Sequence, residues 1–136
     1  MRWEKLTNIN SITDEKAGIY KIIIVDKKNN PYPIPRLLKE DAEGIIYIGK
    51  TTRIKARIKE FLSAKRHKNH SGGITYYRIV EKKLKEKYGD FMLQVHIDIL
   101  PETKIDNAER KEIEKYISQY GEAPPCNSSI PKLNKK

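Results

Sequence analysis

Hydrophobic residues change their spacing along the chain, and two early runs have the composition of buried strands. Residues 17–25 are rich in β-branched side chains and lead into the turn-prone stretch DKKNNPYP, which predicts a strand. The apolar run IIYIG at 45–49 predicts a second strand. We expect these strands to pair antiparallel, because the proline-containing link between them leaves no room for a convincing crossover helix.

Three later segments have the spacing of helices that bury one face. The first, TRIKARIKEFLSAKR at 52–66, has apolar residues at i, i+4, i+7 and i+8, and Thr51 or Thr52 can cap its start. The second is ITYYRIVEKKLKEKYG at 74–89, and the third is KIDNAERKEIEKYISQYG at 104–121. The last two end at a glycine, the residue that most often closes a helix.

An alternating segment, FMLQVHIDIL at 91–100, predicts a third strand. The element order therefore predicts an α+β fold, with a small three-stranded antiparallel sheet flanked by helices. The 136 residues fit one domain over 1–136, with a core at about 17–127 and a long insertion at about 26–43. We expect the proline-rich segment 122–132 to pack back as extended chain.

Composition adds a strong positive charge to this picture. Lysine and arginine together number 28 against 18 acidic residues, giving a net charge of +10 and a pI of about 9.6. Such an excess favours a polyanionic partner, nucleic acid or a membrane surface, although it also suits a merely solubilising surface. No apolar stretch is long enough to cross a bilayer, and the N-terminus does not have the pattern of a signal peptide. The single cysteine, Cys126, fits a reducing compartment, so we expect a cytoplasmic protein.

Two short triplets place a tyrosine beside a glycine in the first two strands. Gly-Ile-Tyr occupies 18–20 and Tyr-Ile-Gly occupies 47–49. Tyr20 should share a face with the isoleucines at alternate positions after it, and Tyr47 should share a face with Ile45 and Gly49. In neighbouring strands the two phenols then lie side by side. Half-buried strand tyrosines are also common without any function.

The chain resembles the GIY-YIG nuclease family in these triplets and in several residues after them. The matching residues are GIY at 18–20, YIGKT at 47–51 and Arg57, which stands eight residues past the second glycine. The resemblance extends to the helix that carries Glu109 and Glu112 and to PPCN, which ends in Asn127. It implies a small stand-alone restriction-type or phage-type endonuclease that hydrolyses DNA phosphodiester bonds with one divalent metal, Mg²⁺, for which Mn²⁺ substitutes.

The resemblance also implies roles for individual residues. Tyr20 would be the general base that activates water, and Tyr47 would orient the water or the phosphate. Lys50 would contact the phosphate and lower the pKa of the tyrosine, because positive neighbours favour the phenolate. Arg57 would bridge phosphate oxygens, a task for which the guanidinium is suited.

The third helix offers two candidates for the metal ligand, of which we expect Glu112 to bind it, with Glu109 as the rival. Glu109 lies near the centre of the apolar stripe and Glu112 lies at its edge. Counting residues back from the PPCN segment, as in the family, favours Glu112. The position on the apolar face of the helix favours Glu109. Glu109 also matches a capping box with Asp106. Asn127 would brace the site by hydrogen bonds to the strand ends.

Phe61 departs from the family pattern. The family usually has His or Tyr one helical turn after the arginine, and a phenylalanine there can neither take nor give a proton. His67 or His70 can stand in, although each is otherwise an ordinary loop residue. The link between the triplets is also longer than the family's usual turn, so it can contact DNA or a partner subunit.

Basic residues cluster around the first predicted helix, where they would neutralise phosphates or simply lie in solvent. They are Arg53, Lys55, Lys59, Lys65, Arg66 and Lys68. The leading hypothesis is thus a metal-dependent endodeoxyribonuclease, as a homodimer if it cuts both strands. The alternatives are a nicking or repair nuclease, a non-catalytic nucleic-acid-binding module, which Phe61 favours, and a ribonucleoprotein component with core tyrosines.

Overall fold

The computed structural model describes residues 3–7, 12, 14–62 and 72–127, and this part of the chain forms an α+β fold. Its elements are β1 (Glu4–Leu6), β2 (Gly18–Val25), β3 (Ile45–Thr51), α1 (Ile54–Leu62), α2 (Gly72–Tyr88), β4 (Met92–Ile99), the 3-10 helix η2 (Glu102–Lys104) and α3 (Ile105–Tyr120). The strands form one antiparallel sheet in the order β1-β4-β2-β3. The predicted class and the pairing of β2 with β3 are confirmed. The predicted count of three strands is wrong, because β1 adds a fourth.

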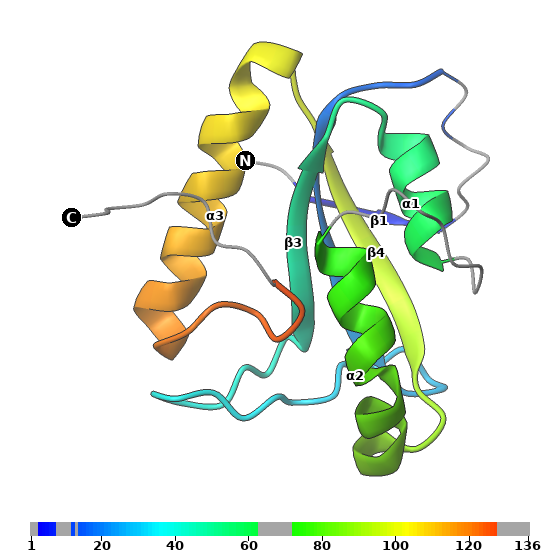
Figure 1. Ribbon diagram of the computed structural model, residues 1–136, viewed down its shortest axis with the longest axis vertical. Coiled ribbons are helices and arrows are strands. Elements are labelled where there is room, and N and C mark those ends of the chain that lie inside the picture. The colour runs from blue at the N-terminus through cyan, green and yellow to red at the C-terminus, as the bar shows by residue number, and fades with distance from the viewer. Residues whose placement is uncertain (1–2, 8–11, 13, 63–71, 128–136) are drawn as a thin grey trace.

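Helices cover both faces of the sheet (Figure 1), and each face has its own apolar core. On one face, β2 and β3 pack against Ile54, Ile58 and Phe61 of α1 and Tyr77 of α2. On the other face, Ile113, Tyr116 and Tyr120 of α3 pack against the opposite side of the same strands. β3 is an edge strand of the sheet, and its residues contribute to both cores.

An irregularity in the pairing of β2 with β3 changes which residues share a face. Ile22 pairs with Tyr47 but the next residue, Ile23, pairs with Ile45, so Ile46 is the extra residue of a bulge. Ile46 and Tyr47 both join the core under α1, while Ile45 joins the core under α3. The expectation that Tyr47 shares a face with Ile45 is therefore wrong, because strict alternation fails at a bulge.

The start of α1 is held by a residue that lies far away in the sequence. The carboxylate of Glu15 accepts hydrogen bonds from the backbone N–H groups of Lys55 (2.9 Å) and Ala56 (3.0 Å). These are donors that a helix leaves unpaired in its first turn. Thr51, an expected cap, accepts instead from the N–H of Arg53 at 2.9 Å, just before the helix. The first turn of α1 is thereby tied to the segment that enters β2.

The insertion between β2 and β3 packs against the C-terminal end of α3. The buried carboxylate of Asp41 accepts hydrogen bonds from the N–H groups of Glu43 (2.8 Å) and Ile45 (3.1 Å) and from the Tyr116 hydroxyl (2.7 Å). The N–H of Leu38 donates to the C=O of Tyr120, where α3 ends. Gly121, with φ of +85°, then closes the helix in the left-handed conformation that glycine accepts at no steric cost. None of the helices in the described part is long and apolar enough to cross a membrane.

Candidate active site

Tyr20 and Tyr47 meet above Gly49, on the sheet face that α1 covers, and Arg57 of α1 lies beside the Tyr20 phenol. We call these three residues the tyrosine–arginine cluster. The two tyrosine rings lie 5.8 Å apart between centroids. Tyr20 is directly opposite Gly49 in the strand pairing. A Cβ added to Gly49 would lie 2.7 Å from the ring of Tyr47 and 2.9 Å from the hydroxyl of Tyr20. The glycine is therefore required for both rings to occupy their places.

The hydroxyl of Tyr20 lies wholly inside the protein. Its side chain is 0% exposed, and no described residue meets the hydroxyl at hydrogen-bonding geometry. Burial and the neighbouring Tyr47 raise the pKa of Tyr20 well above its ordinary value, and the positive charge of Arg57 offsets only part of this rise. Arg57 lowers the pKa of Tyr20 as expected of a cationic neighbour, but desolvation of the phenolate outweighs this effect. Lys50, which was expected to act in the same direction, lies on the other face of β3.

Arg57 comes from α1 and is held by an acidic residue of the same helix. Its Nε lies 3.4 Å from the carboxylate of Glu60, and its side chain is 29% exposed. Arg57 therefore has access to solvent on one side and to the Tyr20 phenol on the other. Sequence reasoning did not single out Glu60, although its i, i+3 spacing from Arg57 was visible.

Phe61 fills the position where a proton-transferring residue was expected. It is 1% exposed, and its ring lies 5.6 Å from that of Tyr47 and 5.3 Å from that of Tyr77. Phe61 thus serves the apolar core and fixes the ring of Tyr47. The stand-in candidates His67 and His70 lie outside the described residues, as do Lys65, Arg66 and Lys68.

Lys50 projects from the opposite face of β3 and meets two carboxylates of α3. Its Nζ lies 2.6 Å from Asp106 and 3.9 Å from Glu109. The Glu109 side chain is 12% exposed, and burial raises its pKa, with Lys50 partly compensating. The capping box expected between Asp106 and Glu109 does not form, because α3 has Lys104 at its N-cap and no side-chain cap. These two carboxylates and Lys50 form what we call the lysine–carboxylate group.

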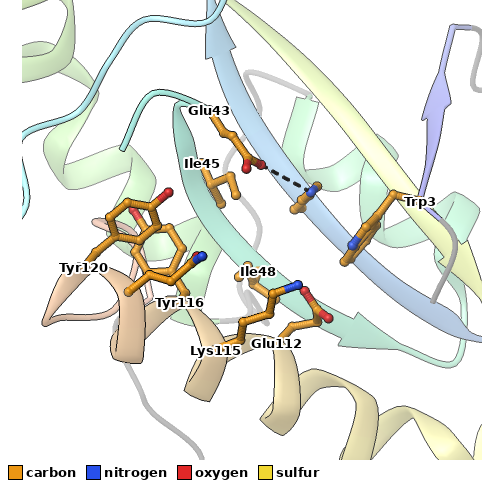
Figure 2. A pocket seen from close by; sticks show the side chains of 10 residues that line it. Trp3, Glu43, Ile45, Ile48, Glu112, Lys115, Tyr116 and Tyr120 are labelled. Atoms are coloured by element: carbon orange, nitrogen blue, oxygen red, sulfur yellow. Dashed lines mark ion pairs between the residues drawn. The ribbon is translucent and has the colours of Figure 1, made fainter. Parts of the chain in front are cut away.

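Glu112 lies one helical turn further along α3 and outside this group. It lines a pocket that also contains Lys21, Glu43 and Trp3 (Figure 2), and its negative charge raises the pKa of Lys21 against the larger lowering by burial. Glu109 and Lys50 are thus brought together, while Glu112 and Lys50 are not. The helix-face argument for Glu109 agrees with this placement, and the argument from the distance to PPCN does not.

The free edge of β3 is covered in one place by the chain that follows α3. The amide of Asn127 donates to the C=O of Ile48 at 2.9 Å and accepts from the N–H of Ile48 at 3.1 Å. The N–H of Cys126 donates to the C=O of Ile46 at 2.7 Å. Because outward backbone groups alternate along a strand, the N–H of Lys50 also points to this edge. Asn127 thus braces the strand beside the site, and none of the described residues is hydrogen-bonded to the edge of β3 at Lys50.

The expected basic residues that the structure describes all belong to α1 or the turn before it. Arg53 and Lys59 are exposed, and Lys55 is half-exposed. Their charges flank Arg57 along the helix. This surface is compatible with a phosphate backbone lying over α1.

The carboxylates beside the β3 edge suit a divalent cation that is held by one protein ligand. Mg²⁺ is commonly bound through one or two carboxylates, with waters completing its shell. Glu109 offers such a carboxylate. Burial raises the pKa of Glu109 because it disfavours the negative charge, and a bound cation would stabilise that charge. Within the described residues, no three His, Cys, Asp or Glu side chains converge as a larger metal cluster would require.

Comparison with known proteins adds no assignment. No family model matches the chain, and neither a curated protein nor a solved structure matches it.

Proposed function

We propose that this protein is a metal-dependent endonuclease that hydrolyses DNA phosphodiester bonds, with a site of the GIY-YIG type. The observation that carries the proposal is that Tyr20 and Tyr47 meet above Gly49, with Arg57 beside the Tyr20 phenol. Three separate segments of chain supply these groups. A core that needed only apolar filling would not place a guanidinium beside a buried phenol that has no hydrogen-bond partner among the described residues.

The edge of β3 at Lys50 is where the scissile phosphate would lie. A phosphate at this edge can meet Arg57 from one face of the sheet and Lys50 from the other. The backbone N–H of Lys50 adds a third donor for its oxygens. Together these groups would stabilise the charge that develops on the phosphate during hydrolysis.

The tyrosines act first as hydrogen-bonding phenols in this proposal. Because its pKa is raised, Tyr20 would be neutral at physiological pH. Its hydroxyl is buried, so it would donate its proton to an oxygen of the phosphate or of the attacking water only after Arg57 moves aside. Proton acceptance by Tyr20 requires more positive charge beside it than Arg57 alone provides. Tyr47, whose ring packs against Phe61, would orient the attacking water or the phosphate.

Glu109 would hold the Mg²⁺, with Asp106 paired to Lys50 beside it. The ion would supply positive charge to the phosphate and to the water that attacks it. This assignment replaces Glu112, which lies in the neighbouring pocket.

The test is cleavage of supercoiled plasmid at low salt, with Mg²⁺ or with EDTA. The wild type is compared with Arg57→Ala and with Arg53→Ala, a matched loss of one positive charge from an exposed position. We expect Mg²⁺-dependent nicking by the wild type and by Arg53→Ala. Arg57→Ala should cut at least about 100-fold more slowly, as for loss of one transition-state donor, while binding DNA and melting like the wild type. Cutting that survives in EDTA or in Arg57→Ala would refute the proposal.

One observation favours a second candidate, a non-catalytic nucleic-acid-binding module. The Tyr20 hydroxyl is 0% exposed, and Phe61 seals Tyr47 from the side of α1. A module of this kind would shift DNA in a gel, with affinity falling steeply as salt rises, and would leave the plasmid uncut.

A further inference from the structure

A second pocket lies beside the proposed active site, on the face of the sheet that α3 covers (Figure 2). It has a volume of about 240 Å³. Its floor is formed by the buried side chains of Ile45 and Ile48 from β3. Glu112, Lys115 and Tyr116 from α3 form one wall, and Trp3, which precedes β1, stands across the pocket from them. None of these residues takes part in the proposed chemistry.

Lys21 occupies this pocket with its hydrogen-bonding capacity unused. Its side chain is 12% exposed, and its Nζ lies 4.6 Å from the centre of the Trp3 ring. Its ion pair with Glu43 spans 3.8 Å, which is too long for a hydrogen bond. Lys21 donates no hydrogen bond to any residue in the described part of the chain. A half-buried ammonium in this state is suited to an acceptor that arrives with a ligand.

The lining combines an aromatic ring with charges of both signs. Lys21 and Lys115 are donors, and Glu43 and Glu112 are acceptors. Guanine has a matching edge, with acceptors at O6 and N7 and donors at N1 and N2. Lysine commonly binds the O6 and N7 pair of guanine. The indole of Trp3 lies under the Lys21 ammonium, which is 4.6 Å from the ring centre, and so it holds the lysine in place beside the cavity.

The place of the pocket links it to the lysine–carboxylate group. Glu109 and Glu112 are three residues apart on α3, so their side chains are neighbours on one helix face. A strand whose phosphate sits at Lys50 would carry its adjacent base past this pocket. Taking a base out of the stack is the usual way for a protein to enclose it.

We infer that this pocket receives a guanine base displaced from the DNA next to the scissile phosphate. The base accepts hydrogen bonds from Lys21, which lies over Trp3, and donates to Glu112. This inference rests on the proposed function for the source of the base, and it gives the enzyme a sequence preference. It also gives Glu112 a role in recognition instead of metal binding.

Trp3 is the single tryptophan of the chain, so its fluorescence reports directly on this pocket. The full-length protein is titrated in EDTA with three duplexes that are identical except at one position. That position carries an unpaired guanine, an unpaired thymine or an abasic residue. We expect the guanine duplex to quench Trp3 and to bind at least about ten-fold more tightly than the other two, in line with one bidentate base contact.

Two variants of α3 separate the pocket from general electrostatics. Glu112→Gln should lose the preference for guanine, and Glu114→Gln, the same change at an exposed position outside the pocket, should keep it. Lys21→Gln, which removes the proposed donor to the base, provides a second test if Glu112→Gln does not fold. Equal quenching by all three duplexes, or a preference unchanged in the pocket variants, would overturn the inference. Free dGMP that binds as tightly as the guanine duplex would overturn the assignment to a DNA base.

The two proposals can fail separately. A guanine preference in a protein that never cuts plasmid would leave the pocket standing and remove the nuclease. Plasmid cutting without any response of Trp3 to guanine would do the reverse.

Discussion

Gly49 and Tyr20 stand opposite each other in neighbouring strands, and the phenol of the tyrosine fills the space that a side chain on the glycine would need. A Cβ at Gly49 would lie 2.9 Å from the Tyr20 hydroxyl. The identity of one residue thus controls the position of the proposed catalytic phenol.

Gly49→Ala should therefore displace both rings of the tyrosine–arginine cluster. We expect destabilisation of about 1–3 kcal/mol, the usual cost of overpacking, and cleavage reduced by far more than this stability loss explains. Gly89→Ala is the control, because Gly89 has φ of +71° and nothing within 4 Å. It should lose some stability through backbone strain but keep its cleavage rate. Denaturant unfolding and plasmid cleavage are measured on both; equal cleavage rates would show that ring placement is unimportant.

Glu109→Gln and Glu112→Gln should differ sharply in plasmid cleavage. Because burial raises the pKa of Glu109, its charge costs stability in the folded protein, and the amide should fold at least as well. Glu109→Gln should nevertheless lose Mg²⁺-dependent cutting. Glu112→Gln should still cut, with a changed sequence preference. The reverse pattern would return the metal to Glu112.

The fold was largely predictable, because its main elements carry regular apolar patterns. The strands at Gly18–Val25, Ile45–Thr51 and Met92–Ile99 and the helix at Ile105–Tyr120 all lie within about two residues of their predicted bounds. β1 was missed because three residues are too few to show a period. The bulge at Ile46 was missed because it depends on how two strands pair and not on the pattern of either.

The candidate site was predictable only where it depends on one strand or one helix. Alternation placed Tyr20 and Tyr47 side by side, and the structure confirms this. The partners of Lys50 come from a helix that begins more than fifty residues later in the chain. The sequence pattern around Asp106 suggested a helix cap, whereas Asp106 pairs with Lys50. Burial of the Tyr20 phenol depends on packing by α1, which reverses the pKa shift expected from charges alone.

Asn127→Ala should weaken the edge of the sheet at Ile48. The substitution removes one donor and one acceptor and leaves two half-buried backbone groups without their partner. We expect a loss of about 1–3 kcal/mol in the free energy of unfolding. Asn107→Ala, at an exposed position of α3, is the control and should change stability by less than about 0.5 kcal/mol. Identical melting of the two variants would mean that Asn127 does not brace the strand.

His96 makes stability depend on pH. Burial lowers the pKa of His96, and the nearby Lys21 and Lys5 lower it further. Between the ordinary value of about 6.5 and the lower folded-state pKa, the unfolded chain binds a proton at this residue and the folded protein does not. The free energy of unfolding should therefore be fully retained above about pH 6.5 and should fall as the pH decreases toward the folded-state pKa.

Denaturant unfolding at a series of pH values tests this with the wild type and His96→Gln. The glutamine cannot titrate but can still hydrogen-bond to Gln94, the present partner of the ring at 2.8 Å. The variant should show a shallower loss of stability on acidification, because the proton uptake that separates the two states is gone. His67 and His70 remain in both proteins, so the difference between the two curves isolates His96. Parallel curves would show that this ring is as easily protonated in the folded protein as in the unfolded chain.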